Sequence, residues 1–398
     1  MSSARGQYVR EARRQLPAMR AWRSAFHREP ELSNEEHRTR QKVVQALSGL
    51  GIPFRTFSDM QGVVALIGGD RPGPVVALRA DMDGLPVTEA TGLPFASRFP
   101  GRMHACGHDV HLSALLGAAA ALRRDGRRLG GPVKLLFQPA EEDGRAGGAG
   151  PLIEKGALRD PKVDFVVGQH VAPEFPLGSI GWRAGPFMAA ADHFIIQIRG
   201  AGGHAGYPHL ATDAVLAASE VITSLQALVS RMRDPRDPVV VSVGMIHGGT
   251  RHNILPDSVD FEGSVRTVRP ITRDKIEAAL RRRVRLVAAS SGARARIRYE
   301  RGYPVTVNDP PTTARLVDAL GVEFGRERMV EVDAPVMGAE DFSRYLEKVP
   351  GAFFFLGVGA PGRSESIHSA RFAPPESALV NGAALLLASV DALQRSGS

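Results

Sequence analysis

Short apolar strands alternate with helices over the first part of the chain, and this alternation most constrains the fold. Strands that alternate with helices are typical of an α/β domain with much parallel pairing. Strands are expected at residues 63–67, 75–78, 133–137, 163–167 and 352–356. Helices are expected at residues 9–26, 37–50, 110–124, 152–158, 312–324 and 376–393.

The middle of the chain has a different order of elements, β-α-β-β-α-β, which is the ferredoxin-like plan. Its strands are expected at residues 193–198, 239–245, 259–268 and 295–299, with helices at 212–232 and 273–289. The sequence therefore predicts an α/β protein of two domains. We expect residues 1–184 and 300–398 to form the main α/β domain and residues 185–299 to form an inserted α+β domain.

The chain has 398 residues and a single cysteine, Cys106, so an intramolecular disulfide is excluded. No run of about 20 apolar residues is present, and the Arg-rich start lacks the apolar segment of a secretory signal. We therefore expect a cytoplasmic protein with no membrane association.

The formal net charge is +8, with 50 Lys and Arg residues against 42 Asp and Glu residues. This balance raises the possibility of nucleic-acid binding. However, the arginines are spread along the chain and aromatic residues do not interleave with them. We expect no nucleic-acid partner, and a general attraction for small anionic substrates remains open.

Polar residues follow three of the expected strands directly. Asp81 and Asp83 come after the strand at 75–78, Glu141 and Glu142 after 133–137, and His170 after 163–167. Ligands of open α/β sheets bind at the carboxyl ends of the strands, so we expect these groups to converge there.

The segment 103–109, Met-His-Ala-Cys-Gly-His-Asp, is the densest polar group in the chain. Cys106 and His108 have a spacing that suits metal binding from a loop, although a lone cysteine is more often an inert core thiol. Glu142, His170 and His368 could complete a set of sulfur, nitrogen and oxygen donors. Such a set suits zinc, and manganese, cobalt or nickel could also bind.

Paired carboxylates such as Glu141 and Glu142 are usually a solvated loop or a helix start. Here they follow a buried strand, where a charge needs a partner and a metal ion would supply one. Two adjacent side chains cannot have the same role, so one should bind metal and the other should act as a base. Sequences typical of serine hydrolases (G-x-S-x-G), helical zincins (H-E-x-x-H) and P-loop enzymes do not occur.

Five segments together resemble the M20 metallopeptidase superfamily. They are MHACGHDVH (103–111), QPAEE (138–142), GHAGYPH (203–209), NILPD (253–257) and GAEDF (338–342). Within that superfamily they are most similar to the amidohydrolase branch of hippurate hydrolases, N-acyl-amino-acid amidohydrolases and plant auxin-conjugate hydrolases. Without this resemblance, the composition of the Gly-rich loops at 202–209 and 248–253 would predict only β-turns with exposed polar residues.

The resemblance implies two divalent metal ions per subunit, with Cys106 bridging them. The implied ligands are Cys106, His108, Glu142, His170 and His368. Glu141 would be the general base and Asp81 an orienting residue, while the inserted domain would be a lid that forms a homodimer. His204 and Asn253 would hold the substrate or its oxyanion, and His204 would act from the same subunit or across the dimer.

The expected reaction is hydrolysis of the amide bond of an N-acetyl, N-benzoyl or aryl-acyl amino acid. Arg266 and Asn253 are candidates to bind the substrate carboxylate. Two alternatives remain open, namely an M20-type dipeptidase or aminopeptidase, and a binding module without catalysis. Gly84 and the pair Ala370-Arg371 depart from the pattern of the family.

Overall fold

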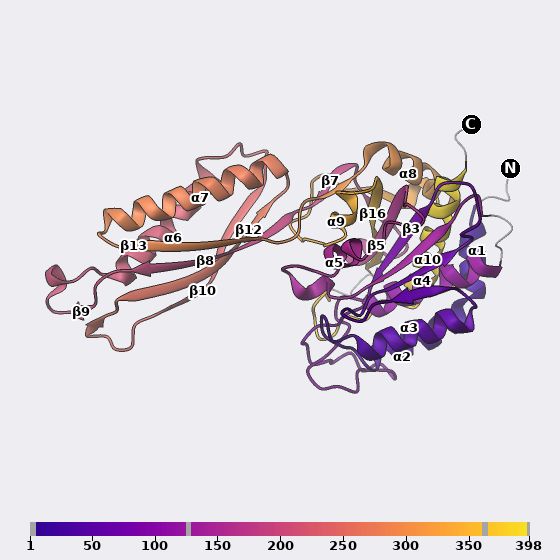
Figure 1. The fold of residues 1–398 in the computed structure, drawn as a ribbon, viewed down its shortest axis with the longest axis horizontal. Coiled ribbons are helices and arrows are strands. Elements are labelled where there is room, and N and C mark those ends of the chain that lie inside the picture. The colour runs from indigo at the N-terminus through magenta and orange to yellow at the C-terminus, as the bar shows by residue number, and fades with distance from the viewer. Residues whose placement is uncertain (1–4, 125–128, 360–364, 396–398) are drawn as a thin grey trace. The chain divides into compact units, whose positions relative to one another are not determined.

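The computed structural model describes residues 5–124, 129–359 and 365–395, and the chain forms two compact units (Figure 1). Unit 2 consists of Met188–Thr306 and Pro335–Glu340. Unit 1 consists of the rest of the chain. The domain bounds predicted from sequence, with an insertion at 185–299, do not include the short segment that joins unit 2 late in the chain.

Unit 1 is built on an eight-stranded sheet with the order β1-β2-β4-β3-β5-β16-β6-β15. Its strands are β1 (Phe54–Thr56), β2 (Val63–Ile67), β3 (Val76–Asp81), β4 (Val133–Gln138), β5 (Phe165–Pro176), β6 (Ile180–Trp182), β15 (Met329–Glu331) and β16 (Gly351–Gly359). The central strands β4, β3, β5 and β16 pair in parallel, which confirms the parallel core expected from the sequence. Their carboxyl ends therefore meet at one edge of the sheet.

Helices α4 and α10 pack against each other and against the central strands. The helices of unit 1 are α1 (Gln7–Arg14), α2 (Leu16–His27), α3 (His37–Gly49), α4 (His108–Arg124), α5 (Ala149–Glu154), α8 (Pro310–Phe324), α9 (Ser343–Leu346) and α10 (Ser377–Gln394). Small residues let α4 approach its neighbours closely, since a Cβ added to Gly117 would lie 2.3 Å from Sδ of Met19. Helix α10 is long and apolar enough to cross a membrane, but 78% of it is buried inside the protein, as in a core helix.

Two features of unit 1 differ from the sequence prediction. The helix expected at 9–26 is two helices, α1 and α2, which meet at Gln15. Pro17 stands in the first turn of α2, where its missing N–H is tolerated but where it cannot continue a helix that has already begun. Strand β5 is longer than expected, because its later residues still pair with β16 as far as Pro176.

Unit 2 contains a four-stranded antiparallel sheet with the order β10-β12-β8-β13. Its elements are β8 (Ala190–Arg199), β9 (Gly203–His204), α6 (Ala214–Ser230), β10 (Val239–Gly248), β11 (Ile254–Leu255), β12 (Ser258–Thr267), α7 (Pro270–Ser290) and β13 (Arg294–Arg301). Buried residues alternate along β8 and β12, and their buried face packs with α6 and α7 in one apolar core. This arrangement confirms the ferredoxin-like plan. Unit 2 also contains the pair β9 with β11. Strand β7 (Gly185–Met188) pairs with β14 (Thr306–Asn308), and most residues of these two strands belong to unit 1.

Candidate metal centre

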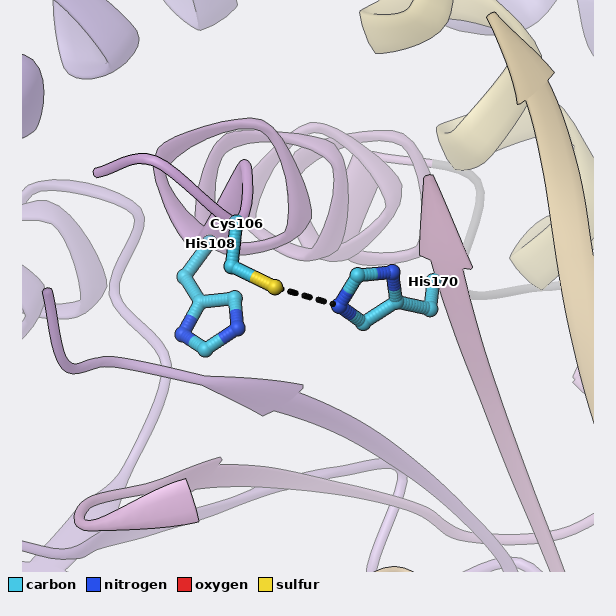
Figure 2. A group of neighbouring side chains, drawn as sticks. All are labelled: Cys106, His108 and His170. Carbon is cyan, nitrogen blue, oxygen red and sulfur yellow. Dashed lines mark hydrogen bonds between the residues drawn. The ribbon is translucent and has the colours of Figure 1, made fainter. Parts of the chain in front are cut away.

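The loop before α4 places two of the predicted ligands side by side. Gly107 separates Cys106 from His108 and has a φ of 84°, a conformation that favours glycine. A Cβ at this position would lie 2.5 Å from a methyl group of Val171. Only glycine therefore fits between the two candidate ligands, and the turn brings both side chains to the edge of the sheet beside His170 (Figure 2).

The thiol of Cys106 lies between two imidazoles. Its Sγ is 3.2 Å from Nε2 of His170 and 3.3 Å from Nε2 of His368. His170 donates its Nδ1–H to the carbonyl oxygen of Val171 at 2.7 Å, which leaves Nε2 to face the sulfur. Burial lowers the pKa of His170 to about 3, so its ring is neutral and Nε2 carries a lone pair. A sulfur shared by two imidazoles is suited to bridge two metal ions.

His108 and Glu142 supply the remaining donors. His108 is fully buried and donates Nδ1–H to the carbonyl oxygen of Asp83 at 2.9 Å. Its Nε2 has no hydrogen-bond partner among the described residues, and neither does the buried Oε1 of Glu142. Oε1 of Glu142 is 3.3 Å from Nε2 of His368. The structure thus brings all five predicted ligands together.

The ligand atoms form overlapping groups whose members lie within 4.8 Å of one another. These groups are Cys106 with His108 and His170, Cys106 with Glu142 and His368, and His108 with Glu141 and Glu142. Cys106 belongs to the first two groups, as expected for a bridging ligand. Orphaned buried donors in a mixed sulfur, nitrogen and oxygen set fit a divalent cation.

The charges around the thiol also favour a cation. Burial, together with the carboxylates of Glu142 and Glu141, raises the pKa of Cys106 far above that of a free thiol. Burial alone would lower the pKa of His108, but nearby carboxylates, chiefly Asp81 and Asp83, raise it to about 10. A bound cation would compensate this excess of negative charge and would stabilise the thiolate.

Glu141 is buried and begins the 3-10 turn Glu141–Asp143 that follows β4. The residue before it, Ala140, has a left-handed backbone with a φ of 55°. Glu142 is placed independently, since its backbone N–H donates to Oδ2 of Asp83 at 2.9 Å. The turn therefore directs two adjacent carboxylates to the edge of the sheet.

Asp81 and His111 form a buried layer behind the ligands. Oδ1 of Asp81 accepts from Nδ1 of His111 at 2.7 Å, and Oδ2 accepts from Arg79 at 2.6 Å. Arg79 also donates to Asp341 at 2.9 Å, and His111 accepts the backbone N–H of Val171 through Nε2. This network orients the strand ends that carry the site.

Several residues with evident positioning contacts have no role in the sequence prediction. Asp83 holds the backbone of Glu142 and the ring of His108, yet the sequence shows only that it follows a strand. Arg79, His111 and Asp341 come together from distant parts of the chain. No local pattern signals these pairings.

The three predicted lid residues lie in unit 2. His204 and Asn253 are both exposed. They are neighbours because β9 pairs with β11 and Ala205 donates its N–H to the carbonyl oxygen of Asn253 at 3.1 Å. Arg266 is half-buried on β12, opposite Ala191 of β8. Burial lowers the pKa of Arg266, and the described residues offer its guanidinium no hydrogen-bond partner.

Arg266 is distant from the other two lid residues. β8 pairs with β12 from Ala191 opposite Arg266 to Arg199 opposite Ser258, a length of eight residues. At about 3.3 Å per residue, this length is about 25 Å. The loop that carries His204 begins past the Arg199 end. The structure therefore does not bring Arg266 together with His204 and Asn253 within one chain.

The fold and the ligand cluster define a metal-dependent hydrolase with an α/β unit and a ferredoxin-like unit. Residues 77–392 match Peptidase family M20/M25/M40, and the chain belongs to this family. It is an amide-bond hydrolase that binds divalent metal.

Sequence matches to related proteins extend over almost the whole chain. Thermostable carboxypeptidase 2 of Saccharolobus solfataricus is 40% identical over 91% of this chain and 91% of its own length. N-acetyl-L-cysteine deacetylase of Bacillus subtilis is 39% identical over 93% of this chain and 87% of its own length. N-acetyldiaminopimelate deacetylase of Halalkalibacterium halodurans is 38% identical over 91% of this chain and 96% of its own length.

Solved structures show the same fold. The YxeP protein of Bacillus subtilis, described as a dinuclear metal-binding peptidase of the M20 family, has a TM-score of 0.81 and 34% identity. The match covers 95% of this chain and 98% of that one. The crystal structure of a protein from methicillin-resistant Staphylococcus aureus matches this chain with a TM-score of 0.90 and 33% identity. The match covers 98% of this chain and 100% of that one.

Proposed function

We propose that the enzyme hydrolyses N-acyl L-amino acids, with an acetyl, benzoyl or aryl-acyl group, to a carboxylic acid and a free amino acid. The cluster around Cys106, with Glu141 beside it, is the observation that carries this proposal. The deacetylases among the relatives act, by name, on small N-acetyl amino acids. The Arg-rich chain, at +8, favours substrates that carry a carboxylate.

The proposed cofactor is a pair of divalent ions, drawn from zinc, manganese, cobalt and nickel. Cys106 would be shared, His108 and His170 would complete one position, and Glu142 and His368 the other. When bound, such ions lower the pKa of water and polarise the carbonyl of the scissile amide.

Glu141 is the proposed general base and acid. An oxygen of its buried carboxylate lies within 4.8 Å of candidate ligand atoms of His108 and Glu142. It would accept a proton from the attacking water and then donate it to the leaving amine. Asp81 would keep His111 and the end of β3 in place through the buried network.

The lid residues would serve the substrate from two copies of the chain. His204 would donate to the oxyanion, Asn253 would assist it, and Arg266 would bind the substrate carboxylate. About 25 Å along β8 separates Arg266 from the His204 loop, so one small substrate cannot touch both in a single subunit. A homodimer through unit 2 would solve this, with His204 and Asn253 acting on the partner subunit's site.

The two edges of the unit 2 sheet differ in a way that supports one dimer surface. Strand β10 exposes Val240, Met245 and Ile246, whereas β13 exposes arginines such as Arg294 and Arg296. Apolar side chains on an edge strand favour association, and arginines oppose it. Ile246→Asp should convert the dimer to a monomer in light scattering, while Arg296→Asp should not. A wild-type monomer would contradict this proposal.

The decisive test of the function is metal analysis followed by a substrate panel. We expect bound divalent metal, and hydrolysis of N-acetyl, N-benzoyl or indole-acyl amino acids that is lost with a chelator. Cleavage of dipeptides alone would favour the second candidate, a peptidase, which the name of the Saccharolobus relative supports. A metal-loaded protein inert towards both classes would indicate a binding module.

We also propose that the enzyme works in the cytoplasm, since oxidation of Cys106 would remove a ligand. Recovery of the protein in the soluble cytoplasmic fraction of its host would test this.

A further inference from the structure

The side chain of Glu36 is buried and makes no hydrogen bond to the helix that it precedes. Glu36 stands at the N-cap of α3 but makes no capping hydrogen bond through its side chain. Instead, the carboxylate of Glu31 accepts from the backbone N–H of Thr39 at 2.8 Å and from that of Arg38 at 3.1 Å. The carbonyl oxygen of Glu36 accepts the N–H of Arg40, but its side chain is not used to cap the helix, although an N-cap side chain usually provides this contact.

Glu36 reaches across to the turn that carries the two active-site glutamates. Its Oε1 accepts the backbone N–H of Ala140 at 2.7 Å, from 104 residues away in the chain. The side chain has no exposed surface, and Oε2 is buried without a hydrogen-bond partner among the described residues. Burial, and to a lesser degree the carboxylate of Asp83, raise the pKa of Glu36 to about 8. Burying a carboxylate in this way is costly for the fold.

The contact falls on a strained residue. Ala140 has a φ of 55° and a ψ of 39°, a left-handed conformation that is uncommon for residues other than glycine. Strained positions of this kind persist only where their surroundings hold them. Ala140 directly precedes Glu141, so the direction of the Glu141 side chain depends on this backbone conformation.

Glu142, the other member of the pair, has its own support from Asp83. Ser33, from the same segment as Glu36, donates to the same oxygen of Asp83 at 2.7 Å. The segment from Ser33 to Glu36 thus supports the turn in two ways. Ser33 contacts Asp83, which holds the backbone of Glu142, and Glu36 contacts Ala140, the residue directly before Glu141.

We propose that Glu36 is a positioning residue for the general base: it holds Ala140 in the left-handed conformation that directs Glu141 to the reacting amide. The role assigned to Glu141 rests on the proposed function, whereas the conformational role of Glu36 does not. No part of the proposal requires Glu36 to touch substrate or metal.

The test compares Glu36→Ala with Glu36→Gln. The alanine variant should lower kcat about 10- to 100-fold, since small misplacements of a catalytic group have effects of this size. KM should stay within about threefold, and metal content should be unchanged because Asp83 still holds Glu142. The glutamine variant keeps an acceptor for the Ala140 N–H and should retain kcat within about threefold. A loss in the glutamine variant equal to that in the alanine variant would overturn the proposal.

A second change tests the conformational cause. Glycine adopts a positive φ without strain, so Ala140→Gly in the Glu36→Ala background should regain part of the lost kcat. No regain would argue that Glu36 does not act through this turn. The matched control is Glu31→Ala, which removes another buried carboxylate of the same segment. It should lower the melting temperature yet leave kcat within about twofold, and an equal loss of kcat would show a merely structural effect.

Amide hydrogen exchange in the metal-free protein gives a readout that does not depend on activity. The peptide that covers Ala140 should exchange at least about tenfold faster in Glu36→Ala than in wild type or Glu31→Ala. Unchanged exchange would overturn the proposal even if the substrate panel fails. Conversely, an inert wild type with the expected exchange would reject the proposed function and retain the role of Glu36.

Discussion

The backbone N–H of His368 donates to the carbonyl oxygen of Ala105 at 2.8 Å, which fastens a segment near the end of the chain to the loop of Cys106. His368 also has a left-handed backbone, with a φ of 65°. This tie places Nε2 of His368 3.3 Å from the sulfur of Cys106. A backbone contact of the protein itself therefore holds His368 beside Cys106, and this part of the site is preorganised for metal.

Removal of the shared thiol should remove metal. Cys106→Ala deletes the atom that belongs to both ligand groups, so we expect the bound metal measured by elemental analysis to fall by at least half. Ser113→Ala, which removes a buried hydroxyl of α4 outside the ligand set, should keep the wild-type metal content. Full metal content in Cys106→Ala would mean that the thiol is only part of the core.

Substitution of the proposed base should separate catalysis from metal binding. Glu141→Gln keeps the size of the side chain and removes its ability to accept a proton from water. We expect kcat to fall about 10²- to 10⁴-fold with unchanged metal content, measured on the best substrate of the panel. Near-normal turnover would exclude Glu141 as the base.

The sequence was sufficient to predict the parallel core and the ferredoxin-like plan, because each depends on a local pattern. It was also sufficient to predict that Cys106, His108, Glu142 and His170 lie close together. The strands could be recognised from short apolar runs, and the parallel arrangement brings their carboxyl ends together. His368 is different, since it follows none of the predicted strands. The sequence offers it only as one more nitrogen donor, and the resemblance to a family is what assigns it to the same site as Cys106.

The supporting contacts could not be predicted from local patterns. Glu36 and Ala140, or Arg79 and Asp341, meet only through tertiary packing, and no periodicity connects them. Pro17 indicates the break between α1 and α2 at Gln15, but the helical pattern of apolar residues continues on both sides of it, so the sequence predicts a single helix. The length of β5 depends on its pairing with β16, which the sequence of β5 does not reveal.

Loss of the Asp81 carboxylate should destabilise the fold as well as the site. Asp81 is fully buried, and its carboxylate accepts hydrogen bonds from both Arg79 and His111. Asp81→Asn removes this negative charge from beside the buried guanidinium of Arg79. Breaking a buried ion pair typically lowers the free energy of unfolding by about 3 kcal/mol. Urea unfolding of the metal-free protein would measure this, with the exposed pair Asp318–Arg326 as control through Asp318→Asn. Equal stability of the two variants would contradict the role of the buried network.

The pH dependence of stability should depend on His27. Burial alone would lower its pKa, but the carboxylates of Asp109 and Glu89 raise it from 6.5 to about 9. Because the pKa is higher in the folded state, protonated His27 stabilises the fold fully below pH 6.5. This contribution, at most about 3 kcal/mol, is lost as the pH rises through 9.

His27→Gln should therefore be less stable than wild type at pH 6, and the difference should narrow at pH 10. Thermal unfolding at the two pH values would measure it, with the exposed His37→Gln as control. A difference that is constant with pH would show that His27 contributes through packing alone.

Mixing two inactive variants should restore activity if His204 acts across a dimer. His204→Ala and Glu141→Gln each disable both sites of their own homodimers. In a hybrid dimer, the subunit with an intact Glu141 receives His204 from the partner, so one of its two sites is complete. Random association makes half of the dimers hybrid, and coexpression should yield about a quarter of wild-type kcat per subunit. If His204 acts within its own subunit, every site in the hybrid carries one defect and no activity returns. The separation of Arg266 from the His204 loop along β8 is the reason to expect restoration.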